Sequence, residues 1–226
     1  MRRSKLKADL HAHTHFSRDA VTSVETFARR YAESGIDCVA VSDHNNVDGA
    51  LAVREIAGFR VIIAEEIKSN EGEIIGLFLQ ETIRRGLTPE DTVKAIREQG
   101  GLVLIPHPFD RLRGSPLREE AILRIMADID VIEVFNARTT FKADDARGRR
   151  LAEEHGKPMS AATDAHSPWE IGLAYTELPD FDGPNEFLAS IGRATISGRR
   201  SFFGVHLIST WAKIKWRLRL GRRVAQ

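Results

Sequence analysis

Short apolar runs rich in Val and Ile recur along this chain, and nearly all of them lead directly into His, Asp or Glu. The runs do not alternate between polar and apolar residues, which is typical of parallel strands covered on both faces. We predict strands at Leu6–Leu10, Ile36–Val41, Arg60–Ile67, Leu102–Ile105, Val131–Phe135 and Pro158–Thr163, and further strands at Ile74–Leu79 and Ile171–Thr176.

Segments with helical periodicity lie between these runs, at Ser23–Ser34, Pro89–Gln99, Leu117–Met126 and Phe141–His155. Thr88 before Pro89 is typical of a helix start, and Gly35 and Gly100 stand where helices should end. Repeated strand–helix units predict a parallel sheet or barrel with right-handed crossovers, and 226 residues suit one such barrel.

The polar residues at the strand ends carry the functional signal, because in a β/α barrel these ends converge on one face. Residues i and i+2 of a strand point the same way, so His11 and His13 can bind one ion together. Asp164 and His166 repeat this spacing, and Asp9 lies on the same side as His11, where it would orient a ligand.

Other candidate ligands are weaker when taken singly. Glu65 and Glu66 end an Ile-rich strand, where buried carboxylates are rare unless they are paired or metal-bound. His107 is held between two prolines, which suits a ligand but also an ordinary loop. His44 lies in an Asp-His-Asn sequence that is equally typical of a turn. We expect the chain to turn after Thr14, so that His15 does not bind metal. Taken together, five of the eight histidines lie just beyond predicted strands.

Imidazole and carboxylate ligands without thiolates indicate Zn, Mn or Fe rather than Ca or Mg alone. The single cysteine, Cys38, excludes Cys-rich zinc modules and an intramolecular disulfide. Because the candidate ligands exceed one coordination sphere, we expect two or three divalent ions, with Glu66 as the bridging carboxylate. Such clusters hydrolyse phosphate esters: one ion generates hydroxide and the others neutralise the remaining oxygens.

Ordered motifs of this chain resemble those of the polymerase-and-histidinol-phosphatase (PHP) superfamily of metal-dependent phosphoesterases. They are Asp9–Thr14 with Ser17 and Asp19, Ser42–Asn45, Ala64–Ile67, Ile105–Pro108, Ile132–Asn136 and Thr163–His166. The resemblance implies an α/β fold, a distorted (β/α)7 TIM-like barrel, with a trinuclear metal cluster.

The resemblance also implies which residues bind metal. The first ion would take His11, His13, Glu66 and Asp164; the second would share Glu66 and take His107; the third would take Asp19, His44 and His166. Some members add a histidine near the strand at 131–135, where this chain offers only Glu133 and Asn136. His44 and His166 would also relay protons where they are not committed to metal.

Several residues that follow these motifs are candidates for substrate binding: Arg18, Arg111, Arg113, Arg138 and Asn136. An arginine can clamp a phosphate through two parallel hydrogen bonds, although each could also be a solvated loop residue. The expected substrate is a phosphorylated small molecule, a nucleotide or an oligonucleotide end. Between Glu66 and Pro106 there is no room for the inserted domain common in members that act on nucleotides or short RNA.

The end of the chain is basic. After Glu186 it has nine basic and no acidic side chains, whereas the rest holds 24 basic against 32 acidic. We predict the phosphoesterase barrel over residues 1–200 and a basic amphipathic helix within 201–226, at Val205–Arg223, with an apolar stripe of Leu207, Trp211, Ile214 and Leu218. This helix could close the barrel through Trp211, bind a membrane surface or guide a nucleic acid.

The expected function is hydrolysis of phosphate mono- or diesters by a metal-bound hydroxide at a di- or trinuclear cluster. One alternative is a non-catalytic metal-binding or regulatory PHP-like module. Another is hydrolysis of a carbon–nitrogen bond, for which a carboxylated lysine or a lone catalytic Asp after the last strand would be expected. Lys68 is the one near candidate for the lysine. No apolar run reaches the about 18 residues of a membrane span, and the basic N-terminus lacks the apolar core of a signal peptide, so we expect a cytoplasmic protein.

Overall fold

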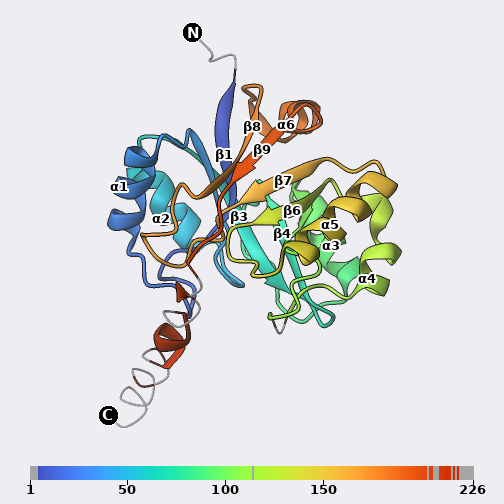
Figure 1. Ribbon diagram of the computed structural model, residues 1–226, viewed down its shortest axis with the longest axis horizontal. Coiled ribbons are helices and arrows are strands. Elements are labelled where there is room, and N and C mark those ends of the chain that lie inside the picture. Colours follow the sequence, from blue (N-terminus) through green and yellow to red (C-terminus); the bar gives the residue numbers. More distant parts are fainter. Residues whose placement is uncertain are drawn as a thin grey trace.

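The computed structural model describes residues 5–113, 115–202, 204–205, 209–214, 216 and 218. Within them, nine strands form one sheet in the order β7-β6-β5-β4-β3-β2-β1-β8-β9 (Figure 1). The strands are β1 (Leu6–Ala12), β2 (Cys38–Val41), β3 (Arg60–Lys68), β4 (Glu73–Leu77), β5 (Leu102–Ile105), β6 (Val131–Asn136), β7 (Met159–Ala162), β8 (Ala174–Leu178) and β9 (Thr195–Gly198). All eight predicted strands are confirmed within a few residues, and β9 was missed.

The sheet is not wholly parallel, which corrects the expectation from the apolar runs. β1, β2 and β3 are parallel to one another, as are β5, β6 and β7, but β4 runs antiparallel to both of its neighbours. The reason is the turn at residues 69–72, which is too short for a crossover and turns the chain straight back. Gly72 permits this turn with a φ of +146°, and a Cβ there would lie 2.3 Å from the Cα of Leu117.

The two ends of this strand series meet, so the sheet is a nearly closed barrel. The segment after β7 bonds to β1: the N–H of Asp164 donates to the carbonyl of His11 (2.8 Å), and the N–H of His13 donates to that of Ala165 (3.0 Å). β8 and β9 extend the sheet beyond β1 as antiparallel strands. The predicted distorted TIM-like barrel is thereby confirmed.

The carboxylate of Asp9 fastens this closure. It accepts hydrogen bonds from the hydroxyls of Tyr31 (2.8 Å) and Thr163 (2.5 Å) and from the Thr163 N–H (3.0 Å). Burial raises the pKa of Asp9 to about 6, although these hydrogen bonds act to lower it. Asp9 therefore ties α1 and the segment after β7 to β1. It also accepts from the N–H of His11 (3.4 Å), so its contact with a candidate ligand is through the backbone.

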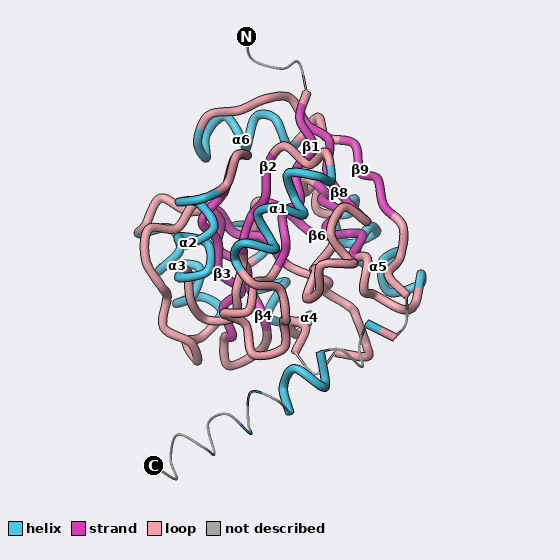
Figure 2. Tube along the Cα trace, turned by 90° about the vertical axis from the view of Figure 1, so that its left-hand side faces the viewer, coloured by secondary structure: helices cyan, strands magenta, loops and turns pink. Residues whose placement is uncertain are grey.

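The helices surround the sheet (Figures 1 and 2): α1 (Val24–Ser34), α2 (Asp48–Ile56), α3 (Pro89–Glu98), α4 (Glu119–Arg124), α5 (Lys142–Glu154) and α6 (Gly183–Ile191), with a 3₁₀ turn at Met126–Asp128. The predicted helix start at Thr88 is confirmed, since its hydroxyl accepts from the N–H of Asp91. The predicted helix end at Gly35 is also confirmed, since Gly35 ends α1 with a φ of +76°. α2 and α6 were missed. α2 has no side-chain cap and buries only Gly49, Ala50 and Val53, so its pattern is faint.

Two apolar layers hold the barrel together. One joins inward residues such as Leu10, Ile62 and Leu104 to Phe187 of α6, the helix at the end where β1 begins (Figure 1). The other joins alternate strand residues such as Val39 to the faces of α1 to α5. With one end closed by α6, the opposite end, at which β1 finishes, is left for polar side chains.

The C-terminal segment lies at that opposite end (Figures 1 and 2), where residues 209–214 are helical. Of the predicted Val205–Arg223 helix, Leu207, Lys215, Arg217, Arg219, Leu220, Arg222 and Arg223 lie outside the described residues, and the division at residue 200 stays a prediction. Packing through Trp211 is corrected, because Trp211 is 55% exposed whereas Ser209 and Ala212 are buried. The barrel end is polar, and the helix places Ser209 and Ala212, not Trp211, against it. Among the described residues, no helix is long and apolar enough to cross a membrane.

The thiol of Cys38 provides a test of this packing. Cys38 is fully buried in β2, and burial raises the pKa of its thiol to about 12. We expect no reaction with a thiol reagent such as DTNB in the native protein at about pH 8, because the reactive species is the thiolate. One thiol should react once denaturant unfolds the chain. Rapid labelling of the native protein would contradict the fold described here.

Candidate metal centre

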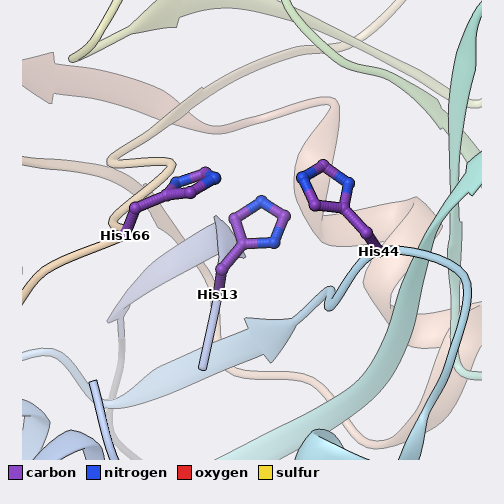
Figure 3. Close-up of side chains that lie close together, drawn as sticks. All are labelled: His13, His44 and His166. Atoms are coloured by element: carbon purple, nitrogen blue, oxygen red, sulfur yellow. The ribbon is translucent and has the colours of Figure 1, made fainter. Parts of the chain in front are cut away.

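The strand ends gather five histidines and three carboxylates into one polar cluster at the open end of the barrel. Its members are His11, His13, Asp19, His44, Glu66, His107, Asp164 and His166, and all except His44 are buried. Figure 3 shows the rings of His13, His44 and His166 pointing toward one another from three separate segments. The structure thus brings together every residue predicted to bind metal.

Hydrogen bonds from Nδ1 to acceptors of the protein fix the orientation of the rings of His11, His13 and His166. Nδ1 of His166 lies 2.8 Å from the carbonyl oxygen of Asp164, and since a carbonyl only accepts, this nitrogen carries the proton. Nδ1 of His11 likewise donates to Glu133 (3.0 Å). Nδ1 of His13 donates to the hydroxyl of Ser17 (3.1 Å), whose own proton goes to Asp43.

Because Nδ1 is held as a donor, Nε2 of each ring faces the centre of the cluster and offers a lone pair there once it carries no proton. The Nε2 atoms of His11 and His13 lie only 3.0 Å apart, and each is 3.2–3.5 Å from carboxylate oxygens of Glu66 and Asp164. Lone pairs and carboxylates packed this closely repel one another unless protons or cations lie among them. This is the arrangement that a metal ion requires of imidazole ligands.

Several buried polar atoms of the cluster lack a hydrogen bond: Asp19 Oδ1, Glu66 Oε2, Asp164 Oδ1 and Nδ1 of His107. A buried carboxylate oxygen without a partner is costly, and these three face histidines rather than donors of ordinary geometry. Cations would satisfy them all. The residues present therefore fit divalent metal ions.

Geometry alone divides the cluster into overlapping groups whose ligand atoms lie within 4.8 Å of one another. They are His13–His44–His166, His11–Glu66–His107, His11–His13–Asp164 and His44–Glu66–Glu73. Glu66 belongs to two of the groups, with Oε1 3.1 Å from Nε2 of His107 and Oε2 3.0 Å from Nδ1 of His44. The two oxygens of Glu66 thus face different histidines of the cluster.

Electrostatics in the cluster follow from burial among opposite charges. Burial opposes protonation of His11 and His44, but neighbouring carboxylates outweigh it and hold both pKa values well above the usual value. Conversely, burial favours a neutral Glu66, but His44 and His11 hold its pKa well below the usual value. For His166, burial and then Arg138 lower the pKa to about 3, so its imidazole is neutral.

Backbone conformation adds to the precision of the site. His107 and Asp164 have φ values of +28° and +51°, a left-handed region that residues other than glycine rarely occupy. Both lie two residues after the end of a strand, β5 for His107 and β7 for Asp164. Strain of this kind persists only where surrounding contacts over-determine it, and it is concentrated at functional sites.

Two acidic residues of the site were not predicted as ligands. Glu133 accepts from Nδ1 of His11 and from the N–H of His107 (3.2 Å), so it orients two ligand segments. Glu73 lies beside His44 and Glu66. It opens β4, and because β4 is antiparallel, its first residue lies at the edge where the parallel strands end. The short turn before Glu73 was the available signal for this reversal.

Three of the predicted substrate-binding arginines lie at the entrance. A cavity of about 470 Å³ is lined by Asp19, His44 and His166 together with Arg113 and Arg138. Arg113 forms an ion pair with Asp164. A neighbouring cavity of about 540 Å³ shares Asp19 and His44 and is lined by Arg18.

The structure does not bring the other two candidates into these cavities. Arg111 forms a bidentate pair with Asp144 and points away, with 61% of its side chain exposed. Asn136 is fully buried, and its amide donates to Glu133 (2.7 Å) and Asp164 (3.1 Å). Asn136 thus supports the carboxylates of the cluster instead of facing a substrate.

Comparison with known proteins agrees with this architecture. Profiles for the PHP domain and for a PHP-associated region match residues 9–106 and 136–196. An uncharacterized protein of Methanocaldococcus jannaschii is 40% identical over 146 residues, which is 58% of this chain and 82% of that protein. The chain therefore belongs to the PHP family.

Two solved structures share the fold at low identity. A two-domain protein from Bacteroides vulgatus, described as containing a predicted PHP-like metal-dependent phosphoesterase, superposes with a TM-score of 0.71 at 17% identity. The match covers 86% of this chain and 65% of that one. A lesion-specific endonuclease from Pyrococcus furiosus has a TM-score of 0.58 at 19% identity, covering 85% of this chain and 57% of that one. This chain thus spans less than two thirds of either protein.

Metal content tests the cluster directly. We expect protein purified without added metal or chelator to contain bound Mn, Zn or Fe, and His13→Ala to lose most of it because His13 belongs to two of the ligand groups. His15→Ala is a matched control, since that exposed side chain lies two residues away. Elemental mass spectrometry gives the stoichiometry. Equal metal in both variants would contradict the site.

The pH dependence of metal binding provides a second test. Because carboxylates raise the pKa values of His11 and His44, both rings are protonated at neutral pH without metal and must lose those protons to bind an ion. The apparent affinity should therefore rise between about pH 6 and pH 8, with proton release on binding. Calorimetry in buffers of different ionisation enthalpy measures that release. An affinity independent of pH, without proton release, would disprove the assignment.

Proposed function

We propose that this protein is a hydrolase of phosphate mono- or diesters that depends on two or three divalent ions, Mn, Zn or Fe. The ions would be held by His11, His13, Asp19, His44, Glu66, His107, Asp164 and His166. The single observation that carries the proposal is the convergence of buried, unpartnered donor atoms with arginines at the mouth of one cavity. Membership of the PHP family supports it.

The number and position of ligands favour more than one ion. Glu66 presents its two oxygens to different histidines, and Glu73 adds a carboxylate beside His44. Glu73 would thereby help to hold an ion together with His44 and Glu66. When bound, such ions supply the Lewis acidity that makes water a nucleophile at neutral pH and offset charge on phosphate oxygens.

The residues of the chain itself perform the remaining tasks. Arg113 and Arg138 line the cavity beside the ligands and would hold the phosphate, whose negative charge they match. His44 is the ligand-type residue most open to solvent, with 24% of its side chain exposed, so it is the candidate for moving a proton at the leaving oxygen. His166 is neutral with Nδ1–H donated to the carbonyl of Asp164, and its lowered pKa makes Nε2 a poor proton acceptor, which favours His44 for this role.

The proposed substrates are a phosphorylated small molecule, a nucleotide or an oligonucleotide end. The fold shared with a lesion-specific endonuclease supports the nucleic-acid candidates. The size of the cavity supports the smaller ones, since it admits a phosphate and a compact leaving group.

Model substrates test the proposal. We expect protein loaded with Mn or Zn to hydrolyse p-nitrophenyl phosphate or its bis ester, but not the amide p-nitroacetanilide. Glu66→Gln and Asp164→Asn should lower kcat/KM by about 100-fold or more, because even residues that only orient a metal ligand contribute 10- to 100-fold. The matched control, His15→Ala, should retain full activity.

Two outcomes would decide against the proposal. Metal-loaded, folded protein that hydrolyses neither phosphate substrate favours a non-catalytic binding or regulatory module. Hydrolysis of the amide in place of the esters would assign carbon–nitrogen bond chemistry.

A further inference from the structure

The C-terminal helical segment forms part of the cavity wall above the cluster. Ser209, Thr210 and Lys213 line the first cavity, and Lys213 and Trp216 line the second. Lys213 is thus common to both, together with Asp19, His44 and Glu73. A segment at the far end of the sequence therefore borders directly on the candidate metal centre.

Specific contacts hold the segment there. The guanidinium of Arg138, which is itself buried, donates to the hydroxyl of Ser209 (2.8 Å), and the guanidinium of Arg18 lies over the Trp216 ring at 4.4 Å. Ser209, Lys213 and Trp216 are spaced by four and three residues, so they share one helix face. That face is turned toward the barrel entrance.

Lys213 meets the cluster at a single carboxylate. Its Nζ lies 3.2 Å from Oδ2 of Asp19, whereas Oδ1 of Asp19 faces His44 and His166 at 3.3 and 3.5 Å. The two oxygens thus have separate roles, and an ion bound at Oδ1 leaves the ammonium group in place. About 59% of the Lys213 side chain is exposed, so Nζ can reach a molecule in either cavity.

The charges around this cavity define what Lys213 can recognise. Arg113 and Arg138 line the cavity from the barrel, and Lys213 lines it from the C-terminal helical segment. Arg113 and Arg138 also pair with carboxylates outside the cluster, those of Asp110 and Glu170. Divalent ions that neutralise Asp19 would therefore leave the charge of Lys213 for an anion at the entrance. A small, multiply charged anion matches such a site, and a phosphate group is of this class.

We propose that Lys213 is a substrate-binding residue that contacts a phosphate group, so that the C-terminal helical segment completes the site. The inference rests on the proposed phosphoesterase function and extends it. It assigns to the basic C-terminal helical segment a role in binding the substrate at the candidate metal centre, and not a role in binding a partner elsewhere on the surface. Residues of both the barrel and this segment would then form the anion-binding site.

Binding of inorganic phosphate to the metal-loaded full-length protein tests the inference without turnover. We expect Lys213→Ala to weaken binding by about tenfold or more, as for loss of one charged hydrogen bond. Lys213→Arg should retain most of the affinity. Lys94→Ala is the matched control, because Lys94 is exposed on α3 and takes no part in either cavity.

Calorimetry gives the affinities, and metal content and thermal unfolding of the same samples confirm that each variant is folded and loaded. With a model ester, Lys213→Ala should raise KM more than it lowers kcat. Wild-type protein that binds no phosphate, or Lys213→Ala that binds it as tightly as wild type, overturns the inference. Phosphate binding that depends on Lys213 in a protein with no esterase activity would instead uphold the anion site and reject the proposed function.

Discussion

The acceptors that lie behind the histidine rings constrain everything else at this site. Because Nδ1 of His11, His13 and His166 is each committed to a protein acceptor, three Nε2 lone pairs must share one buried volume with the carboxylates of Glu66 and Asp164. Such a volume is unfavourable without positive charge, since buried lone pairs and carboxylates repel one another. Protonated imidazoles and arginine supply that charge in the metal-free protein. Divalent ions are the species that the geometry of the donors suits.

Closure of the barrel and assembly of the site depend on the same few residues. The carboxylate of Asp9 binds Tyr31 of α1 and Thr163 of the segment after β7, and that segment continues into Asp164 and His166. The backbone bonds that pair His11 and His13 with this segment also place their side chains. A substitution that loosens the closure would therefore displace ligands from both sides of the cluster, even without touching one of them.

Much of this could be predicted from the sequence, and the failures have identifiable causes. Most of the candidate ligands at strand ends followed from strand parity and from the convergence of parallel strands, which depend on local pattern alone. Asp19 was singled out only by the resemblance to the PHP superfamily. Glu73 escaped because its position depends on the reversed direction of β4, which a short turn decides. Arg111 was misjudged because its partner, Asp144, lies on a distant helix. Packing of the apolar stripe on the barrel through Trp211 was one of three roles left open, but the surface at that end is polar, and the helix presents another face to it.

The hydrogen bond between Thr163 and Asp9 joins residues 154 positions apart. Contacts of such long range form late and slowly in folding, because the entropy of a large loop must be lost before they contribute. The candidate ligands near β1 and those after β7 come together only when the segment after β7 has paired with β1. A partly folded chain therefore holds only part of the cluster. Ions that bind the complete cluster would therefore require the closed barrel, and by binding only that form they would stabilise it against unfolding.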